Sequence, residues 1–428
     1  MEANRKNIFL IGLNDFNREK LHSIDHAGDY EFHGLLPHSA IAERSTYDSA
    51  AIVDNAIRQL ESFDGRVDGI VGYMDFPVST MVPVLCRHFG LASPSLESVL
   101  KCEHKYWSRL EQSRSVPEVI PRFTRFNPFD DEAIEHIELP YPYWVKPVKS
   151  FGSHMGFRIT GREALRQAVA IIRRNIERLA EPFNYFLRQA ELPTEIANVD
   201  AHFCLAEEII SAGRQCTLEG YVFDGEVNIH GVVDSIRFPG TSVFSRYQYP
   251  SLVPAHARRR MTGIVERFLH HIDYDHGAFN AEFFWDQKRD RISLLEINPR
   301  IAQHHSDLFE KVDGASNHQV AVQVAAGERP HFPHRQGPFA SAAVFFIRRF
   351  EDGYVARLPR PEEIDAVKAA LPGTIVQLEA REGLRLSELY EQDSYSYIIG
   401  IVYVGGRNPT ELRHKYQQCL DSLTFRFE

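Results

Sequence analysis

Short apolar runs alternate with longer segments of helical periodicity along the first hundred residues. The strand-like runs are NIFLIGL, YEFHGLL and VDGIVGY. Between and after them, SAAIVDNAIRQLESF and STMVPVLCRHFGL place apolar residues three and four positions apart, as an amphipathic helix does. This alternation predicts a parallel sheet with crossover helices, so we expect an α/β domain over residues 1–100. It lacks a dinucleotide fingerprint, because Gly12 in LIGLND has no partner glycines.

The pattern changes in the rest of the chain. Helical spacing predicts helices over residues 98–112, 162–180 and 254–271. Strands are expected in YPYWVKPVKSFGSHMGFRIT, which contains a glycine loop, and in FCLAEEIISAG and CTLEGYVFDGEVNIHGVVD. After Pro330, strands from SAAVFFIRRF to YIIGIVYVGGRNP precede the helix TELRHKYQQCLDSL and predict a small α+β domain. A chain of 428 residues is long enough for two or three such domains.

The segment GAFNAEFFWDQKRDRISLLEINPR carries the strongest chemical signal. It predicts two antiparallel strands, and a turn centred near residue 289 would place Glu282 opposite Glu296, with Cβ atoms roughly 5 Å apart. Glu296, Asn298 and Arg300 alternate and therefore share one face of the strand. Two opposed carboxylates and an amide oxygen suit Mg²⁺, although a solvated acidic sheet face is an alternative from this segment alone.

The glycine loop in YWVKPVKSFGSHMG follows an apolar strand that ends in Lys146. A lysine in that position calls for a buried anion. Gly152 and Gly156 let backbone N–H groups approach a phosphate, and the hydroxyls of Ser150 and Ser153 can donate to it. The loop is not of the GxxxxGK[ST] type, and a plain turn between strands is the alternative interpretation.

Charge and cysteine content exclude several classes of protein. The 48 basic and 58 acidic residues give a net charge of −10, which argues against a general binder of nucleic acid or of anionic membranes. The five cysteines are an odd number without metal-like spacing, so neither a disulfide framework nor a zinc site is expected. We expect a reduced, cytoplasmic setting, with no export signal and no membrane span.

Taken together, these elements resemble the ATP-grasp superfamily over nearly the whole chain. The resemblance implies a fold of the α/β and α+β classes. It places a Rossmann-like pre-ATP-grasp domain at 1–100, an ATP-grasp domain at 101–335 with a small lid subdomain at about 140–210, and a C-terminal α+β domain at 336–428. The last is similar to those of amino-acid ligases and biotin carboxylase.

The resemblance also implies roles for individual residues. The lysines in EHKYWSRL and VKP contact ATP phosphates, the glycine loop covers them, and AEEIISAG is the hinge that holds adenine through the backbone of Glu208 and Ile210. Arg300 stabilises the activated acyl group. The implied ATP-binding residues are Lys105, Lys146, Lys149, Ser150, Gly152, Ser153, Gly156, Glu207, Glu208, Ile209, Ile210 and Gln215. The implied ligands of Mg²⁺ or Mn²⁺ are Glu282, Glu296 and Asn298, and the implied catalytic residues are Arg300 and Lys146.

Two departures from family patterns limit this assignment. Gln215 is the nearest match to the ribose-binding glutamate, with Glu219 as the alternative. The motif RIAQHH places His304 where biotin carboxylase has its catalytic glutamate, which argues against a biotin carboxylase. His304 and His305 either face the substrate or have a structural role.

The carboxylate and amine substrates are not identified by sequence. Arg237, Arg246 and Tyr247 in DSIRFPGTSVFSRYQYPS either bind a substrate or belong to a turn-rich connection. We expect an ADP-forming ligase that joins a small acid, such as an amino acid, to an amine. The alternatives are a bicarbonate-activating enzyme and a nucleotide-binding regulatory protein without catalysis. Because many family members dimerise, a homodimer is also an expectation.

Overall fold

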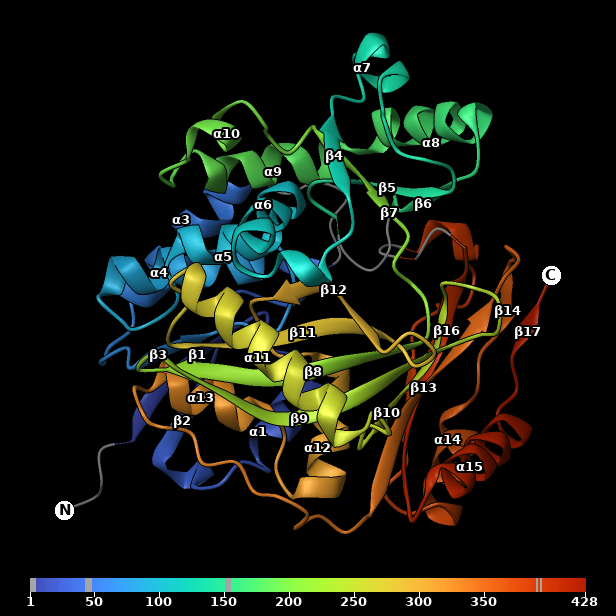
Figure 1. The fold of residues 1–428 in the computed structure, drawn as a ribbon. Helices are drawn as coiled ribbons and strands as arrows, with labels where there is room; N and C mark the ends of the chain where they lie inside the picture. The colour runs from blue at the N-terminus through green and yellow to red at the C-terminus, as the bar shows by residue number, and fades with distance from the viewer. Residues whose placement is uncertain (1–4, 43–47, 151–154, 390–391, 393–394) are drawn as a thin grey trace.

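A computed structural model describes residues 5–42, 48–150, 155–389, 392 and 395–428 (Figure 1). The N-terminal region forms a three-stranded parallel sheet in the order β2-β1-β3, which confirms the α/β prediction. Its strands are β1 (Lys6–Ile11), β2 (Tyr30–Leu35) and β3 (Gly69–Val71). Its helices are α1 (Asp15–Leu21), α2 (Ser39–Ala42), α3 (Ser49–Glu61) and α4 (Val78–Phe89), with a 3₁₀ turn at Ala27–Asp29.

A second, antiparallel sheet of four strands forms a lid at the top of Figure 1, in the order β4-β7-β5-β6. Its strands are β4 (Phe123–Phe126), β5 (Tyr143–Pro147), β6 (Phe157–Ile159) and β7 (Cys204–Glu208). Its helices are α7 (Asp131–Glu135), α8 (Arg162–Asn175), α9 (Glu177–Leu187) and α10 (Thr194–Ala197). The helix predicted over 162–180 is thus two helices that end seven residues later. The helical face continues because Phe183, Phe186 and Leu187 are also buried.

The third sheet has eight antiparallel strands in the order β12-β11-β8-β9-β10-β13-β16-β15. Its strands are β8 (Arg214–Phe223), β9 (Glu226–Arg237), β10 (Phe244–Tyr249), β11 (Gly277–Asp286), β12 (Arg291–Asn298), β13 (Ser341–Arg349), β15 (Ile375–Leu378) and β16 (Tyr397–Gly406). Since Tyr247 of β10 pairs with Val344 of β13, the sheet continues without interruption from the central region into the C-terminal region. A short pair, β14 (Val355–Arg357) and β17 (Arg426–Phe427), lies at its side.

Helices cover both faces of this sheet. One face packs on α11 (Ala255–His271) through residues such as Leu218 and Val222, and the alternate residues Tyr221 and Phe223 pack on the opposite side against α13 (His318–Ala325). The remaining helices are α12 (Ser306–Asp313), α14 (Pro361–Ala370) and α15 (Pro409–Ser422), and further 3₁₀ turns occupy Pro117–Val119, Gln303–His305 and Leu386–Glu388. Within the described residues, no helix has the length and apolar character needed to cross a membrane. All five cysteines are buried and unpaired.

A break at His104 divides the helix that the sequence predicts over 98–112. It separates α5 (Leu96–Glu103) from α6 (Lys105–Ser115). His104 Nδ1 accepts a hydrogen bond from the Trp107 N–H (3.1 Å), and Nε2 lies 3.0 Å from the Val199 carbonyl oxygen. Burial lowers the pKa of His104 to about 4, so the ring is neutral and can make both contacts. The break makes Lys105 the first residue of α6, where its N–H donates to the Val148 carbonyl just beyond β5 (2.8 Å).

Candidate active site

The hairpin of β11 and β12 places Glu282 directly opposite Glu296, as predicted. This pairing depends on a β-bulge, whereas the sequence suggests that the position of the turn alone produces it. Closer to the turn, Phe283 pairs with Leu294, and a β-bulge at Leu295 then shifts the register by one residue. Without the bulge, Glu282 would face Leu295, and Glu296 would point to the opposite face of the sheet.

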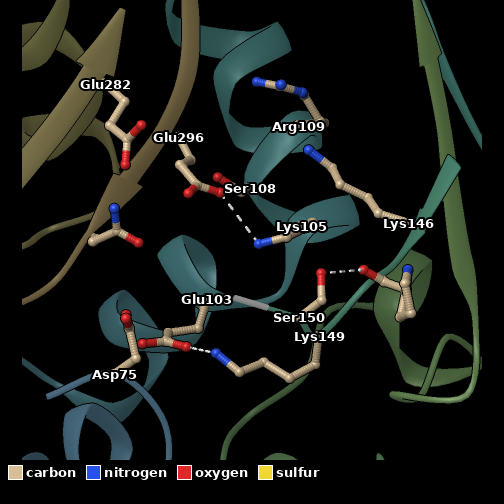
Figure 2. A network of polar contacts seen from close by, with 12 residues as sticks. Asp75, Glu103, Lys105, Ser108, Arg109, Lys146, Lys149, Ser150, Glu282 and Glu296 are labelled. Carbon is tan, nitrogen blue, oxygen red and sulfur yellow. Dashed lines mark hydrogen bonds and ion pairs between the residues drawn. The ribbon is translucent and has the colours of Figure 1, made fainter. Parts of the chain in front are cut away.

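The two carboxylates have different electrostatic surroundings (Figure 2). Burial, together with the charge of Glu296, raises the pKa of Glu282, whose Oε2 accepts a hydrogen bond from Gln215 Nε2 (2.9 Å). Burial also raises the pKa of Glu296, but the charges of Lys105 and Lys146 outweigh it, so that pKa is lowered. Lys105 Nζ lies 3.2 Å from Glu296 Oε2. A buried acidic pair of this kind is relieved by a proton or by a cation.

Asn298 completes a set of three oxygen donors. Its Nδ2 donates to Asn280 Oδ1 (3.0 Å), and Asn280 Nδ2 donates to the Arg300 carbonyl (3.0 Å). Because the Asn298 amide nitrogen is held in this way, its oxygen is the atom left to face a ligand. With Glu282 and Glu296 it lines a central cavity of about 360 Å³. Hard oxygen donors on a rigid hairpin fit Mg²⁺, which binds through a few carboxylates together with phosphate oxygens.

Lys146 at the end of β5 is buried against Glu207 of β7. Its Nζ lies 2.6 Å from Glu207 Oε1, and Arg109 Nε of α6 lies 2.9 Å from Glu207 Oε2. Burial raises the pKa of Glu207, but Arg109 and Lys146 outweigh it and lower the pKa to about 2. The Glu207 carboxylate is therefore ionised and forms ion pairs with both side chains. This explains why the sequence carries a lysine at the end of an apolar strand.

Replacement of Glu207 by alanine should strongly destabilise the fold, because it leaves Arg109 and Lys146 as buried charges without a counterion. Breaking a buried pair typically costs about 3–5 kcal/mol of the free energy of unfolding. The neighbouring Glu208 pairs with Arg122 at the surface, so Glu208→Ala should cost about 1 kcal/mol or less. Urea unfolding followed by tryptophan fluorescence compares the two variants. Equal midpoints would contradict this account of Glu207.

A pocket of about 140 Å³ adjoins the central cavity between the lid and the hairpin. Trp144, Phe284 and Leu295 supply apolar walls, and the hinge residues 207–210 close one side. A flat aromatic base fits between such walls. Gly156 also lines the pocket, and a Cβ at this position would lie 2.8 Å from the Trp144 ring, so a side chain there would displace the tryptophan. The N–H of Glu208 is already bound to the Arg122 carbonyl (3.0 Å).

The glycine loop reaches the same cavity through its first residues. Lys149 and Ser150 line the central cavity, and the Lys149 ammonium contacts the Glu103 carboxylate, which also accepts a hydrogen bond from Ser79 (2.5 Å) (Figure 2). Lys149 therefore lies at the predicted place but already has a buried partner. Gly152 and Ser153 lie outside the described residues.

Arg300 is held by an aspartate that the sequence analysis missed. Its Nη2 lies 2.6 Å and 2.7 Å from the two carboxylate oxygens of Asp75, and its Nε lies 2.9 Å from Oδ1. Nη1 donates to the Ile301 carbonyl (3.3 Å), so one Nη1 hydrogen remains for a ligand. Arg300 and Asp75 line both the central cavity and an adjoining cavity of about 260 Å³.

The two histidines of RIAQHH differ in role. His304 lines both of these cavities, and burial, aided by His305 and Arg300, lowers its pKa to about 4, so its ring is neutral near pH 7. His305 Nδ1 lies 2.8 Å from Glu219 Oε1. Glu219 also accepts from the Ala302 N–H (3.2 Å) and is fully buried away from the three cavities. This placement does not support Glu219 as the ribose-binding residue, whereas Gln215 lines the central cavity.

The three residues predicted from DSIRFPGTSVFSRYQYPS separate in space. Tyr247 lines the central and the 260 Å³ cavities. Arg237 lines the central cavity and the 140 Å³ pocket, with its guanidinium 4.8 Å from the Phe284 ring centroid. Arg246 lines none of these three spaces and faces a different, outer cavity.

Comparison with known proteins gives this geometry a family context. A model of the ATP-grasp domain matches residues 139–307, which include the glycine loop, the hinge and the hairpin. The chain contains an ATP-grasp domain. ATP-grasp enzymes are ATP-dependent ligases that bind ATP with Mg²⁺. A comparison with curated protein sequences gave no significant match.

Solved structures extend the ATP-grasp fold to the full chain. An L-amino acid ligase from Bacillus licheniformis superposes with a TM-score of 0.70 at 17% identity, covering 100% of both chains. A carboxyaminoimidazole ribonucleotide synthase from Aspergillus clavatus, complexed with ATP, gives 0.67 at 13% identity, covering 98% of each chain. The biotin carboxylase domain of Hydrogenobacter thermophilus 2-oxoglutarate carboxylase, solved with MgADP and bicarbonate, gives 0.65 at 15%, covering 99% of this chain and 91% of the other.

Some residues of the candidate site come from outside the matched domain. Asp75 follows β3 of the N-terminal sheet, at the carboxyl end of a parallel strand, where ligands of open α/β sheets usually bind. That position is the one signal in the sequence that could have revealed it. Phe346 and Arg348 of β13 close the central cavity from the C-terminal side. The N-terminal, central and C-terminal regions of the chain therefore all contribute side chains to one site.

Proposed function

We propose that this protein is an ADP-forming ligase that activates a small carboxylic acid as an acyl phosphate and joins it to an amine. The observation that carries the proposal is the convergence of Lys105, the three oxygen donors of the hairpin and Arg300 around one cavity, beside an adenine-sized pocket that Lys105 and Lys146 line. The resemblance in fold to an L-amino acid ligase supports an amino acid as one substrate.

The residues of the site would have separate roles in binding the metal and the ATP phosphates. Glu282, Glu296 and Asn298 would hold Mg²⁺, and Lys105 and Lys146 would contact the ATP phosphates. Magnesium, when bound, neutralises charge on the transferred phosphoryl group. Lys105 can turn from Glu296 toward a phosphate, because its contact of 3.2 Å is long for an ion pair and Glu296 would then face the metal. Lys146 stays anchored to Glu207 and acts as a fixed charge.

The acid would lie between the phosphates and the 260 Å³ cavity. Arg300, Tyr247 and His304 line both the central cavity and the 260 Å³ cavity. A neutral His304 cannot supply a negative charge at the position where biotin carboxylase has a glutamate, which weighs against bicarbonate activation. Its ring can still accept or donate one hydrogen bond to the acid or the amine.

We propose the same division of the chain as the sequence suggests. Residues 101–335 would be the ATP-grasp unit, with residues 140–210 as the lid, and residues 1–100 and 336–428 would close the substrate side. Asp75 and Arg348 support this division, because each brings a charged side chain to the central cavity from a flanking region.

Asp75→Asn should slow ligation while leaving ATP affinity nearly unchanged. Asparagine keeps the volume but cannot hold the Arg300 guanidinium in the same bidentate geometry, and misplacement of a catalytic group by about 1 Å can cost roughly 100-fold in rate. Steady-state kcat with acid and amine, together with titration of a non-hydrolysable ATP analogue, separates the two effects. A matched control is Asp25→Asn, remote in the N-terminal domain. An unchanged kcat in Asp75→Asn would show that Arg300 does not need this anchor.

The proposal as a whole is tested by ADP and phosphate release from Mg-ATP. The assay covers amino acids, small carboxylic acids and bicarbonate, each with and without an amine, and mass spectrometry identifies the product. Release that requires both an acid and an amine is the expected result. Release with bicarbonate alone would replace the proposal by a carboxylase activity. Tight ATP binding without turnover on any pair would favour a regulatory nucleotide-binding protein.

A further inference from the structure

A large outer cavity, about 1200 Å³ in volume, adjoins the adenine-sized pocket. It lies between the lid, the central sheet and the C-terminal region, and it shares Trp144, Phe284 and Arg237 with the smaller pocket. Five arginines line it, and Asp234 is the one acidic residue among the described residues of its wall. The arginines are Arg158 of β6, Arg214 of β8, Arg237 of β9, Arg246 of β10 and Arg413 of α15.

None of these arginines forms a direct ion pair with a carboxylate within the part of the chain that the structure describes. Arg246 Nε contacts Gln248 Oε1 at 3.4 Å, and Arg413 Nη2 donates to Thr410 Oγ1 (3.2 Å). Arg237 Nε is buried without a hydrogen-bond partner. Some arginines elsewhere do form such pairs, as Arg260 does with Asp290 (2.7 Å). Within the described residues, five guanidinium groups without a carboxylate in direct contact thus line one cavity.

The arginines also repel one another. Burial and the charge of Arg413 both lower the pKa of Arg246, although guanidinium groups stay protonated near neutral pH. Asp234 gives limited compensation, because its carboxylate already accepts hydrogen bonds from Ser251 Oγ and from the Leu252 N–H (2.9 Å) and burial raises its pKa. Five positive groups therefore face one negative group in a protein whose net charge is −10. A bound anion would relieve this repulsion.

We propose that the outer cavity binds a small molecule with two or more negative charges on phosphate or carboxylate groups. The guanidinium fork makes paired hydrogen bonds to either kind of group. Arginines from five different elements surround the space, so the site is built by the tertiary fold and not by one flexible segment. The site is separate from the phosphate-binding lysines, because neither Lys105 nor Lys146 lines the outer cavity.

The test uses two anions that bind Mg²⁺ weakly, glycerol 3-phosphate and tricarballylate, which separate phosphate from carboxylate recognition. The full chain is titrated calorimetrically at low ionic strength, once alone and once with Mg²⁺ and a non-hydrolysable ATP analogue that fills the lysine site. The expected result is saturable binding of at least one anion in both conditions. The Arg246→Gln/Arg413→Gln variant should bind this anion with an affinity lower by about tenfold or more, because charge-assisted hydrogen bonds are lost.

A matched control is Arg259→Gln/Arg426→Gln, which removes two exposed arginines outside the cavity. Circular dichroism verifies that both double variants are folded, and Arg214→Gln provides a second probe of the cavity if the first double variant is not. No saturable binding of either anion would overturn the proposal, and so would equal affinity in the cavity variants and the control. Failure of the ATP analogue to bind would instead count against the proposed ligase and leave the binding measured without nucleotide as the test of this site.

Discussion

Glu296→Gln is expected to abolish ADP formation and to leave the fold intact. The change removes one charge from the proposed metal site but almost no volume. Loss of about 4 kcal/mol of charge stabilisation in phosphoryl transfer corresponds to a rate reduction of roughly 1000-fold. The substitution also frees Lys105 from its contact with Glu296, so an unpaired ammonium group remains for the ATP phosphates. ATP affinity measured without divalent metal should therefore be retained, while the metal dependence of binding should weaken.

The measurement is ADP release under saturating ATP over a range of Mg²⁺ and Mn²⁺ concentrations. Glu362→Gln is a matched control, because Glu362 is an exposed residue of α14 and the substitution is chemically identical. Circular dichroism and the thermal midpoint should be the same in both variants. If Glu296→Gln retains normal turnover at ordinary Mg²⁺ concentration, the hairpin carboxylates do not form the metal site.

The chemistry of this hairpin could be predicted from sequence because it depends on short-range alternation. Residues two apart on a strand share a face, so the pattern correctly places Glu296 and Asn298 together, whereas Arg300 lies beyond the end of β12 and the strand pattern does not account for its position. The bulge at Leu295 could not be predicted, because nothing in the local pattern marks the extra residue. The predicted pairing with Glu282 was correct because the estimated centre of the turn happened to include the shift that the bulge produces.

Contacts between distant segments account for most of what the sequence did not reveal. Asp75 and Arg300 are 225 positions apart, and no periodicity in either segment relates them. The break at His104 depends on the Val199 carbonyl, 95 positions away, whereas the local pattern of α5 and α6 reads as one helix. Glu219 was a ribose candidate by spacing from the hinge, but its orientation toward His305 is set by the packing of α12 and α13 below the sheet. Local rules point to the candidate groups, and tertiary contacts determine how they are held.

Arg300→Lys is expected to permit ATP binding but to reduce ligation by roughly 100- to 1000-fold, a loss typical of removing one stabilising donor from an active site. The guanidinium of Arg300 makes three contacts with Asp75 and one with the Ile301 carbonyl, and it keeps one N–H for the acyl group. A lysine carries the same charge at a single point and cannot satisfy the Asp75 carboxylate and the acyl oxygen in the same geometry.

The decisive comparison combines Arg300→Lys with Asp75→Asn. If Asp75 acts by holding Arg300, the double variant should ligate no more slowly than Arg300→Lys alone, because the anchor has nothing left to position. If the two losses multiply instead, Asp75 has a separate contact with the substrate. ATP-analogue titration and kcat for acid plus amine are measured on all four proteins of the cycle. Ligation by Arg300→Lys at the rate of the unmodified protein would remove Arg300 from the mechanism, whatever the behaviour of Asp75.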